Sequence, residues 1–230
     1  MTSPTTFEAL GVSRDLVAAL SEQGIVEPFP IQVLTIADGL AGRDVCGKAK
    51  TGSGKTLAFG LPLIERVQQA SPRCPTGLVL VPTRELANQV FGVLEPLAAR
   101  RGHGVAAVYG GVGFEGQIAA LRGGVSIVVG TPGRLIDLLE RGELRLSAVQ
   151  SLVLDEADRM LDMGFLPQVQ KILYRLESEP QTMLFSATLE GAIRRLVDRY
   201  MRDPVFHEVA SREPTVDEMD HRFLLVHQLD

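Results

Sequence analysis

The chain contains no tryptophan and only two cysteines, and aromatic residues make up 5% of its 230 residues. Cys46 and Cys74 form no disulfide framework and no metal-binding spacing, which favours a reducing compartment. The first residues, MTSPTTFEAL, lack the basic and apolar regions of a secretory signal peptide. No apolar run reaches the roughly 18 residues that a membrane-spanning helix needs. The sequence therefore predicts a cytoplasmic protein without a membrane partner.

The chain has no excess of positive charge, and its formal net charge is −5. This balance argues against binding nucleic acid through bulk positive charge, although a local basic patch would not show in the total. The hydrophobic fraction is 45%, which is enough to form a sizeable core. The length fits one large α/β domain, or one domain with a short appendage.

Short apolar segments alternate with helical patterns along the chain. The apolar segments are rich in Val, Leu and Ile with little polar alternation, which is typical of strands buried on both faces of a parallel sheet. We expect strands at 45–48, 78–81, 105–109, 127–129, 151–154, 182–185 and 205–209, and helices at 14–23, 30–40, 55–69, 84–100, 114–122, 132–140, 167–176 and 189–202. This alternation predicts a doubly wound α/β fold with a mostly parallel sheet of about seven strands and helices on both faces.

The sequence AKTGSGKT at 49–56 follows the first expected strand and opens the helix that begins at Lys55, which is the context of a phosphate-binding loop. Glycines let the backbone turn its amide groups toward phosphates, and the helix N-terminus adds partial positive charge. Lys55 would reach the β- and γ-phosphates, and the Thr56 hydroxyl would coordinate Mg²⁺. The plainer alternative is a turn that happens to contain a lysine, and Ala49 departs from the glycine that opens the strict pattern. The other loop residues expected at the nucleotide are Thr51, Gly52, Ser53 and Gly54.

An acidic cluster, Asp155-Glu156-Ala157-Asp158, follows the apolar segment 151–154. At the end of a strand, Asp155 can hold Mg²⁺ through water, and Glu156 can accept a proton from an attacking water. The alternative is an ordinary helix N-terminus, where acidic residues are favoured. Beside the loop at 49–56, the cluster predicts a domain that hydrolyses a nucleoside triphosphate.

These motifs resemble those of the DEAD-box RNA helicases, specifically their N-terminal RecA-like domain. The acidic cluster spells the signature that names this family, and the other motifs stand in the family's order: GIVEPFPIQ at 24–32, PTRELA at 82–87, Gly110-Gly111, TPGR at 131–134 and SAT at 186–188. The resemblance covers the chain from Phe7 to about Val209. It implies an ATP-dependent RNA helicase domain with ATP and Mg²⁺ as cofactors and RNA as a partner. The Ala- and Arg-rich surface helices favour a bacterial source.

The resemblance also implies roles at the adenine base. Gln32 should hydrogen-bond the base edge with Pro30 beside it, and Phe7, which stands 17 residues before Gly24, should stack on the base. The alternative for Phe7 is a core anchor for the first helix. One departure from the family is Phe29, which stands where threonine is usual.

Further roles concern RNA and coupling. Ser186 and Thr188 should bond Asp158 and couple hydrolysis to domain closure. Contacts to the RNA backbone carry little sequence information, although Thr83 and Thr131 also fit as helix N-caps. The expected RNA contacts are Pro82, Thr83, Arg84, Gly110, Gly111, Thr131, Pro132, Gly133 and Arg134.

The family's catalytic unit pairs two RecA-like domains, and the second supplies arginine fingers for the transferring phosphoryl group. No comparable arginine motif follows Thr188. We expect residues 1–210 to form the ATP-binding domain with its adenine-reading extension, and 211–230 to be a linker with the start of a strand at 222–226. The missing second domain and protein adaptors are expected partners, and the chain alone should bind nucleotide but hydrolyse it slowly. Two alternatives stay open: another P-loop ATPase acting on DNA, and a nucleotide-gated interaction module.

Overall fold

The alternating segments form seven strands and nine helices within residues 5–209, the part of the chain that this computed structural model describes. The strands are β1 (Val45–Lys48), β2 (Gly77–Leu80), β3 (Val105–Val108), β4 (Ile127–Gly130), β5 (Ser151–Leu154), β6 (Gln181–Ser186) and β7 (Val205–Glu208). The helices are α1 (Arg14–Glu22), α2 (Pro30–Leu40), α3 (Lys55–Arg66), α4 (Arg84–Ala99), α5 (Glu115–Arg122), α6 (Pro132–Glu140), α7 (Ala157–Asp162), α8 (Leu166–Tyr174) and α9 (Gly191–Tyr200).

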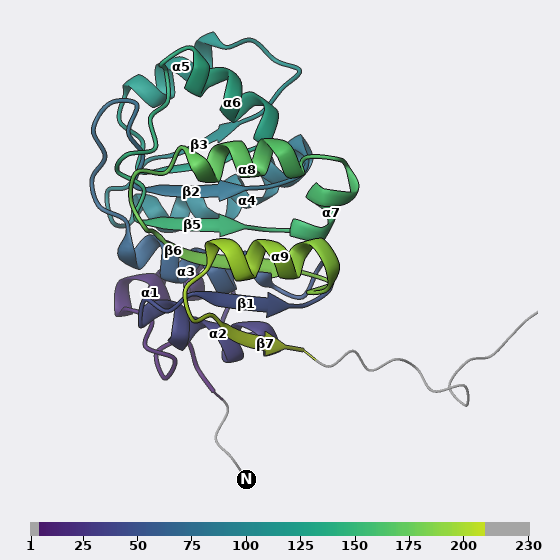
Figure 1. Cartoon of the computed structure of the whole chain (residues 1–230). Coiled ribbons are helices and arrows are strands. Elements are labelled where there is room, and N and C mark those ends of the chain that lie inside the picture. Colours follow the sequence, from purple (N-terminus) through teal and green to yellow (C-terminus); the bar gives the residue numbers. More distant parts are fainter. Residues whose placement is uncertain (1–4, 210–230) are drawn as a thin grey trace, which may run out of the picture.

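All seven strands run parallel in one sheet, in the order β3-β4-β2-β5-β6-β1-β7, and their arrows point the same way in Figure 1. The predicted parallel α/β fold with helices on both faces is confirmed. Strands β1 and β5 and helices α2 and α6 have the predicted limits, and the other predicted elements differ at their ends. Helix α7 was not predicted, because six residues that begin inside an acidic run show no helical periodicity. The linker and the strand expected at 211–226 lie outside the described residues.

The sheet separates two hydrophobic cores. Successive side chains of a strand point to opposite faces, so Val79 and Val153 pack with α1, α2, α3 and α4, whereas their neighbours Leu78 and Leu152 pack with the helices from α5 to α9. In Figure 1, α8 and α9 lie over the near face of the sheet and α3 and α4 lie behind it. Burial of both faces explains why the strand sequences are apolar without alternation.

Because the strands are parallel, the segments that follow them emerge at one edge of the sheet. The segments predicted to bind nucleotide and metal, or to couple hydrolysis to domain closure, follow β1, β5 and β6, which are neighbours in the sheet. The segments predicted to contact RNA follow β2, β3 and β4, which are also neighbours. The two groups of loops thus occupy two halves of one edge, which meet between β2 and β5.

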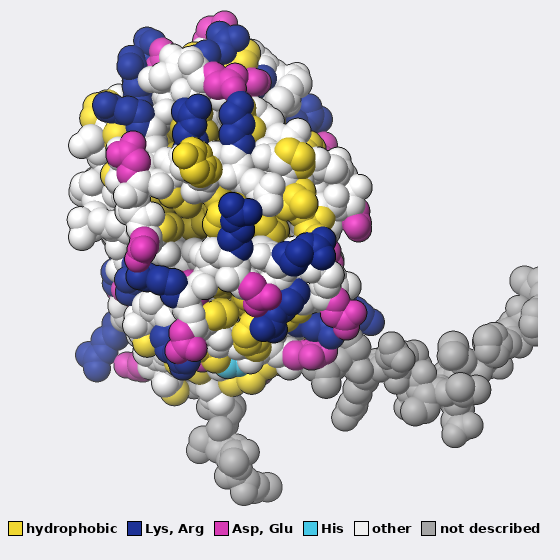
Figure 2. Space-filling view, viewed as in Figure 1, with side chains coloured by type: hydrophobic (Ala, Val, Ile, Leu, Met, Phe, Trp, Pro, Cys, Tyr) yellow, Lys and Arg dark blue, Asp and Glu magenta, His cyan; other side chains and the backbone are white. Residues whose placement is uncertain are grey.

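Figure 2 shows the face that α8 and α9 cover, on which basic and acidic side chains are interspersed with apolar ones. This face carries no broad patch of one charge sign. Within residues 5–209, no helix combines the length and the apolar character that crossing a membrane would require. Both cysteines are buried and unpaired, and burial raises the pKa of the Cys46 thiol to about 12.

Asp44, which directly precedes β1, fastens three segments together. Its buried carboxylate accepts a hydrogen bond of 2.8 Å from the N–H of Thr182 in β6 and one of 2.7 Å from the N–H of Arg202 after α9. A buried carboxylate is tolerated only when such bonds replace its hydration. Asp44 therefore fixes the start of β1, and with it the position of the loop that follows this strand.

We expect Asp44→Ala to lower the free energy of unfolding by about 2–4 kcal/mol, because two amide groups lose their acceptor. Glu8→Ala is the matched control, since the carboxylate of Glu8 is exposed and, among residues 5–209, pairs only with exposed Arg14. Urea denaturation measures both variants. An Asp44→Ala protein with the stability of the control would contradict the assigned role of Asp44.

Candidate functional site

The loop at 49–56 joins β1 to α3 and is shaped by two glycines in the left-handed region. Gly52 has φ 83° and Gly54 has φ 87°, and Gly54 immediately precedes the first residue of α3. The N–H of Ala49 donates a hydrogen bond of 3.0 Å to the carbonyl of Ser186, which fastens the start of the loop to β6. The free amide groups at the start of α3 therefore face the region above the β1 edge, as a phosphate site requires.

Gly54 is the more constrained of the two glycines. A Cβ atom there would lie 2.4 Å from Cδ2 of Phe29 and 2.5 Å from Nε2 of Gln32, whereas a Cβ at Gly52 would meet no atom within 4 Å. Gln32 donates from Nε2 to the Gly54 carbonyl at 2.8 Å and accepts at Oε1 from the Phe29 N–H at 2.8 Å. The start of α2 is thus locked against the phosphate-binding loop.

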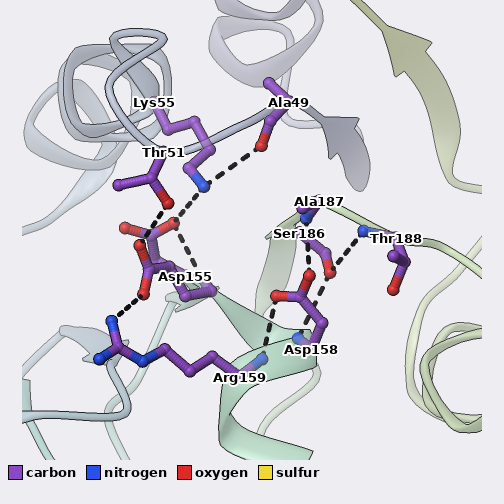
Figure 3. A network of polar contacts seen from close by, with 10 residues as sticks. Ala49, Thr51, Lys55, Asp155, Asp158, Arg159, Ser186, Ala187 and Thr188 are labelled. Atoms are coloured by element: carbon purple, nitrogen blue, oxygen red, sulfur yellow. Dashed lines mark hydrogen bonds and ion pairs between the residues drawn. The ribbon is translucent and has the colours of Figure 1, made fainter. Parts of the chain in front are cut away.

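Lys55 and Asp155 form a buried charge pair between the β1 and β5 loops. Figure 3 shows the Lys55 ammonium group between the Ala49 carbonyl, at 3.3 Å, and Oδ1 of Asp155, at 3.8 Å. Burial raises the pKa of Asp155 to about 6, and the positive charge of Lys55 opposes that rise. The pair places one positive and one negative group at the floor of the site. A polyphosphate can take the place of Asp155 beside the Lys55 ammonium, and a cation can take the place of Lys55 beside the Asp155 carboxylate.

Glu156 adopts an unusual backbone conformation directly after Asp155, with φ 50°. Its Oε1 accepts a hydrogen bond of 2.9 Å from the Thr51 hydroxyl, and its Oε2 accepts one of 3.2 Å from Nη1 of Arg159 (Figure 3). A non-glycine residue in the left-handed region carries strain, which the surrounding contacts must offset. Both carboxylate oxygens are therefore positioned from two sides, by the phosphate-binding loop and by α7.

Asp158, the last acid of the cluster, is bonded to the segment after β6. Its N–H donates to Oγ of Ser186 at 3.3 Å, and its Oδ2 accepts from the N–H of Ala187 at 3.0 Å (Figure 3). Thr188 takes part through its own N–H, which donates to Oγ of Ser186 at 3.3 Å. The expected contact between Asp158 and the Ser-Ala-Thr segment is present, but its carboxylate is bound by Ala187 and not by the Thr188 hydroxyl. Sequence reasoning missed Ala187 because a backbone amide leaves no mark on residue identity.

A cleft of about 790 Å³ opens above these loops. The start of α2 and the segment before it form one wall, α4 forms the other, and the phosphate-binding loop with Asp155 and Glu156 forms the floor. The cleft is lined by Gly24, Ile25, Val26, Glu27, Phe29, Gln32, Thr51, Gly52, Gly54, Lys55, Thr56, Leu57, Leu86, Gln89, Val93, Asp155 and Glu156. Most residues predicted to bind nucleotide thus meet in one cavity.

Phe7 is an exception. Its side chain is 2% exposed, lies in the core that α1 to α4 share, and does not line the cleft. This position fits the alternative stated for Phe7, a core anchor for the first helix. A lone phenylalanine near the chain start carries no sequence signal that separates the two roles, because both need an apolar ring.

The residues predicted to contact RNA lie along the loops after β2, β3 and β4. Thr83 caps α4, since its hydroxyl accepts a hydrogen bond of 3.2 Å from the Leu86 N–H, while the neighbouring Arg84 is exposed. Those with exposed backbone or side chains are Arg84, Gly110, Gly111 and Gly133, and those that are half-buried are Thr83 and Thr131. Pro82 and Pro132 are buried; Pro82 precedes Thr83, the N-cap of α4, and Pro132 is the first residue of α6.

Arg134 differs from its expected role. It is 7% exposed, and its guanidinium donates to the carbonyls of Val112, at 2.7 Å, and Gly113, at 3.4 Å, while lying 4.0 Å over the ring of Phe114. The Arg134 guanidinium therefore stabilises the loop after β3 and points into the protein. The expected direct phosphate contact by Arg134 is not supported.

The site fits a phosphate chain and a hard cation. Ser53 in the phosphate-binding loop has a buried hydroxyl that finds no hydrogen-bond partner within the described part of the chain, and a phosphate oxygen would satisfy it. Within residues 5–209, no group of three or more His, Cys, Asp or Glu side chains could hold a metal ion alone. Mg²⁺ is usually bound by one or two carboxylates together with phosphate oxygens and waters. Thr56 and Asp155 offer that oxygen donor set beside the loop.

Comparisons with known proteins agree with this geometry. The family model described as DEAD/DEAH box helicase matches residues 29–196. The chain is 44% identical over 224 residues to the DEAD-box ATP-dependent RNA helicase CshA of Geobacillus kaustophilus, covering 97% of this chain and 48% of that protein. It is 50% identical over 201 residues to the ATP-dependent RNA helicase DeaD of Klebsiella pneumoniae, covering 87% of this chain and 31% of that protein. The chain thus spans about half or less of the length of these bacterial relatives.

A solved structure shares the fold. The crystal structure of a DEAD box protein from the hyperthermophile Methanococcus jannaschii matches with a TM-score of 0.81 and 38% identity, covering 88% of this chain and 55% of that chain. The likeness therefore covers most of the fold of this chain.

We expect Gly54→Ala to destabilise the protein more than Gly52→Ala. Both substitutions carry the penalty of a left-handed residue, about 1–2 kcal/mol, but only the Cβ at Gly54 meets Phe29 and Gln32. Urea denaturation of the two variants isolates the steric contribution of the α2 contact. Equal stability of the two proteins would contradict the packing described for Gly54.

Proposed function

Because this chain belongs to the DEAD/DEAH box helicase family, we propose that it is the ATP-binding domain of an RNA helicase that clamps RNA and locally unwinds duplexes when ATP binds. The observation that carries the proposal is the cleft itself. It joins a phosphate-binding loop, a buried Lys55–Asp155 pair and the Gln32 amide within one cavity. Residues 1–210 would form this domain, and residues 211–230 would lead into a second RecA-like domain.

Gln32 is suited to select adenine. Its amide carries two donor hydrogens and two acceptor lone pairs, and the contacts with Gly54 and Phe29 use one of each. One donor and one acceptor remain, which matches the acceptor N7 and donor N6 of adenine. A guanine presents two acceptors at this edge, so the proposal is for ATP over GTP.

The hydrolytic chemistry is assigned to residues at the floor of the cleft. Mg²⁺, held by the Thr56 hydroxyl and by Asp155 through water, would supply positive charge that neutralises the phosphates. Lys55 adds a second positive group beside them. Glu156 accepts the proton of the attacking water, and its contacts with Thr51 and Arg159 hold that carboxylate in place.

RNA binding is assigned to the other half of the sheet edge. Exposed Arg84 and the exposed backbone at Gly110, Gly111 and Gly133 offer contacts to phosphate and sugar, with little sequence specificity. Asp158 and Ser186 would transmit closure to the hydrolytic groups, because their hydrogen bond joins the loops after β5 and β6.

The second domain is proposed to complete the site. Within the described residues, none of those that line the cleft is an arginine, although phosphoryl transfer in P-loop enzymes gains about 10³–10⁵-fold from an arginine finger. We assign that arginine to a second RecA-like domain. Adaptors that hold the two domains together are further proposed partners.

We expect the 230-residue chain to bind ADP but to show near-zero ATP turnover at millimolar Mg²⁺, with or without single-stranded RNA. Steady-state phosphate release and calorimetric titration with ADP measure both quantities. Robust turnover stimulated by RNA would contradict the proposed need for a second domain. Stimulation by DNA instead would favour a DNA-dependent ATPase.

Lys55→Ala should weaken ADP binding by at least about tenfold, because a charge-assisted contact to phosphate is lost. Lys171→Ala, on the exposed surface of α8, is the matched control and should bind ADP as the unchanged chain does. Unfolding midpoints of the variants establish that both are folded at the titration temperature. Equal affinities would contradict the assignment of the phosphate site to this loop.

A further inference from the structure

Two exposed apolar side chains stand in the wall of the cleft. Val26 is 65% exposed and Phe29 is 56% exposed, and both line the cavity. Large apolar side chains that are exposed within a concave site, beside a few polar groups, are typical of ligand contacts. The polar groups here are the Gln32 amide and the phosphate-binding loop, so the apolar wall lies where the base of a nucleotide would reach.

Phe29 is held in this wall by its own backbone and ring. Its N–H donates to Oε1 of Gln32 at 2.8 Å, and the following residue, Pro30, begins α2. Its ring packs over the α-carbon of Gly54, because a Cβ at that glycine would lie 2.4 Å from Cδ2. The ring is therefore fixed directly beside the amide that offers hydrogen bonds to the base.

We propose that Phe29 supplies the aromatic contact to the adenine base in this protein, in the place assigned above to Phe7. The inference rests on the proposed function. Phe7 is buried in the core and outside the cleft, so it offers no ring surface to a ligand. Phe29 has more than half of its surface exposed and lines the cleft.

Phe29 and Gln32 would have different effects on the binding of the adenine base. Stacking on a phenyl ring tolerates any base, because every base has a π-face. Phe29 therefore sets how tightly a nucleotide binds, whereas the remaining donor and acceptor of Gln32 set which base is chosen. The phosphates are assigned to the loop at 49–56, to which neither residue belongs.

The first test uses Phe29→Thr and Phe29→Tyr in the 230-residue chain. Phe29→Thr should weaken the binding of ADP and of GDP by a similar factor, about 5- to 150-fold, the range that base–aromatic stacking spans. Inorganic tripolyphosphate, which has no base, should bind both proteins equally, and Phe29→Tyr should retain the ADP affinity of the unchanged chain. Because Phe29 lies at the surface, unfolding midpoints should stay close together.

The second test exploits the absence of tryptophan from the sequence. Phe29→Trp places a single tryptophan in the cleft, and stacking with adenine should quench the tryptophan emission in a saturable manner on addition of ADP but not of tripolyphosphate. Tyr174→Trp is the matched control, because Tyr174 is 86% exposed on α8 and does not line the cleft. Its emission should not respond to ADP.

The outcomes separate this inference from the proposed function. Unchanged ADP affinity in Phe29→Thr, or an emission of Phe29→Trp that ignores ADP while calorimetry detects binding, overturns the role of Phe29 and leaves the proposed function intact. A loss of ADP affinity in Phe7→Leu without a fall in its unfolding midpoint would also overturn it, since Phe7 would then be the stacking residue. An unchanged chain that binds no ADP would overturn the function and the inference together.

Discussion

The parallel direction of all seven strands is the constraint on which the site depends. It brings every loop that follows a strand to one edge, and the order β3-β4-β2-β5-β6-β1-β7 divides those loops into two groups. The loops after β1 and β5 carry the proposed phosphate-binding and acidic residues, the loop after β6 carries the Ser-Ala-Thr segment bonded to Asp158, and those after β2, β3 and β4 carry Arg84 and the exposed Gly110, Gly111 and Gly133. One β-sheet thus holds two chemically different surfaces side by side, with a boundary between β2 and β5.

The loops that follow β1, β5 and β6 contain features that lower the stability of the folded protein. Lys55 and Asp155 are both buried, and the desolvation of such a pair often exceeds its Coulombic attraction. Glu156 adds backbone strain at φ 50°. The surrounding structure offsets these penalties through the two cores and through Asp44, which fixes the start of β1. A bound phosphate would supply the hydrogen-bond partner that the Ser53 hydroxyl does not find among the described residues.

The architecture was predictable from sequence because strands buried on both faces have apolar sequences of a recognisable length. The loop at 49–56 and the acidic cluster were predictable because their chemistry resides in side chains. What escaped prediction depends on tertiary contacts. The burial of Phe7 and Arg134 follows from the α1–α4 core and from the loop at Val112, neither of which is encoded locally. Helix α7 and the Ala187 amide escaped because a short helix and a backbone donor have no sequence pattern.

Hydrogen bonds connect the loops that follow β1, β5 and β6. Ala49 is bonded to Ser186, the Thr51 hydroxyl to Glu156, and Asp158 to Ser186 and Ala187. A phosphate bound in the loop at 49–56 would compete with Oε1 of Glu156 for the Thr51 hydroxyl. Glu156 directly precedes the first residue of α7 and Asp158 is the second residue of this helix, so the two acids lie within one helical turn. The proposed base, Glu156, and the acid that joins the loops after β5 and β6, Asp158, are therefore held close together at the start of α7, and the loop at 49–56 contacts the first of them through the Thr51 hydroxyl.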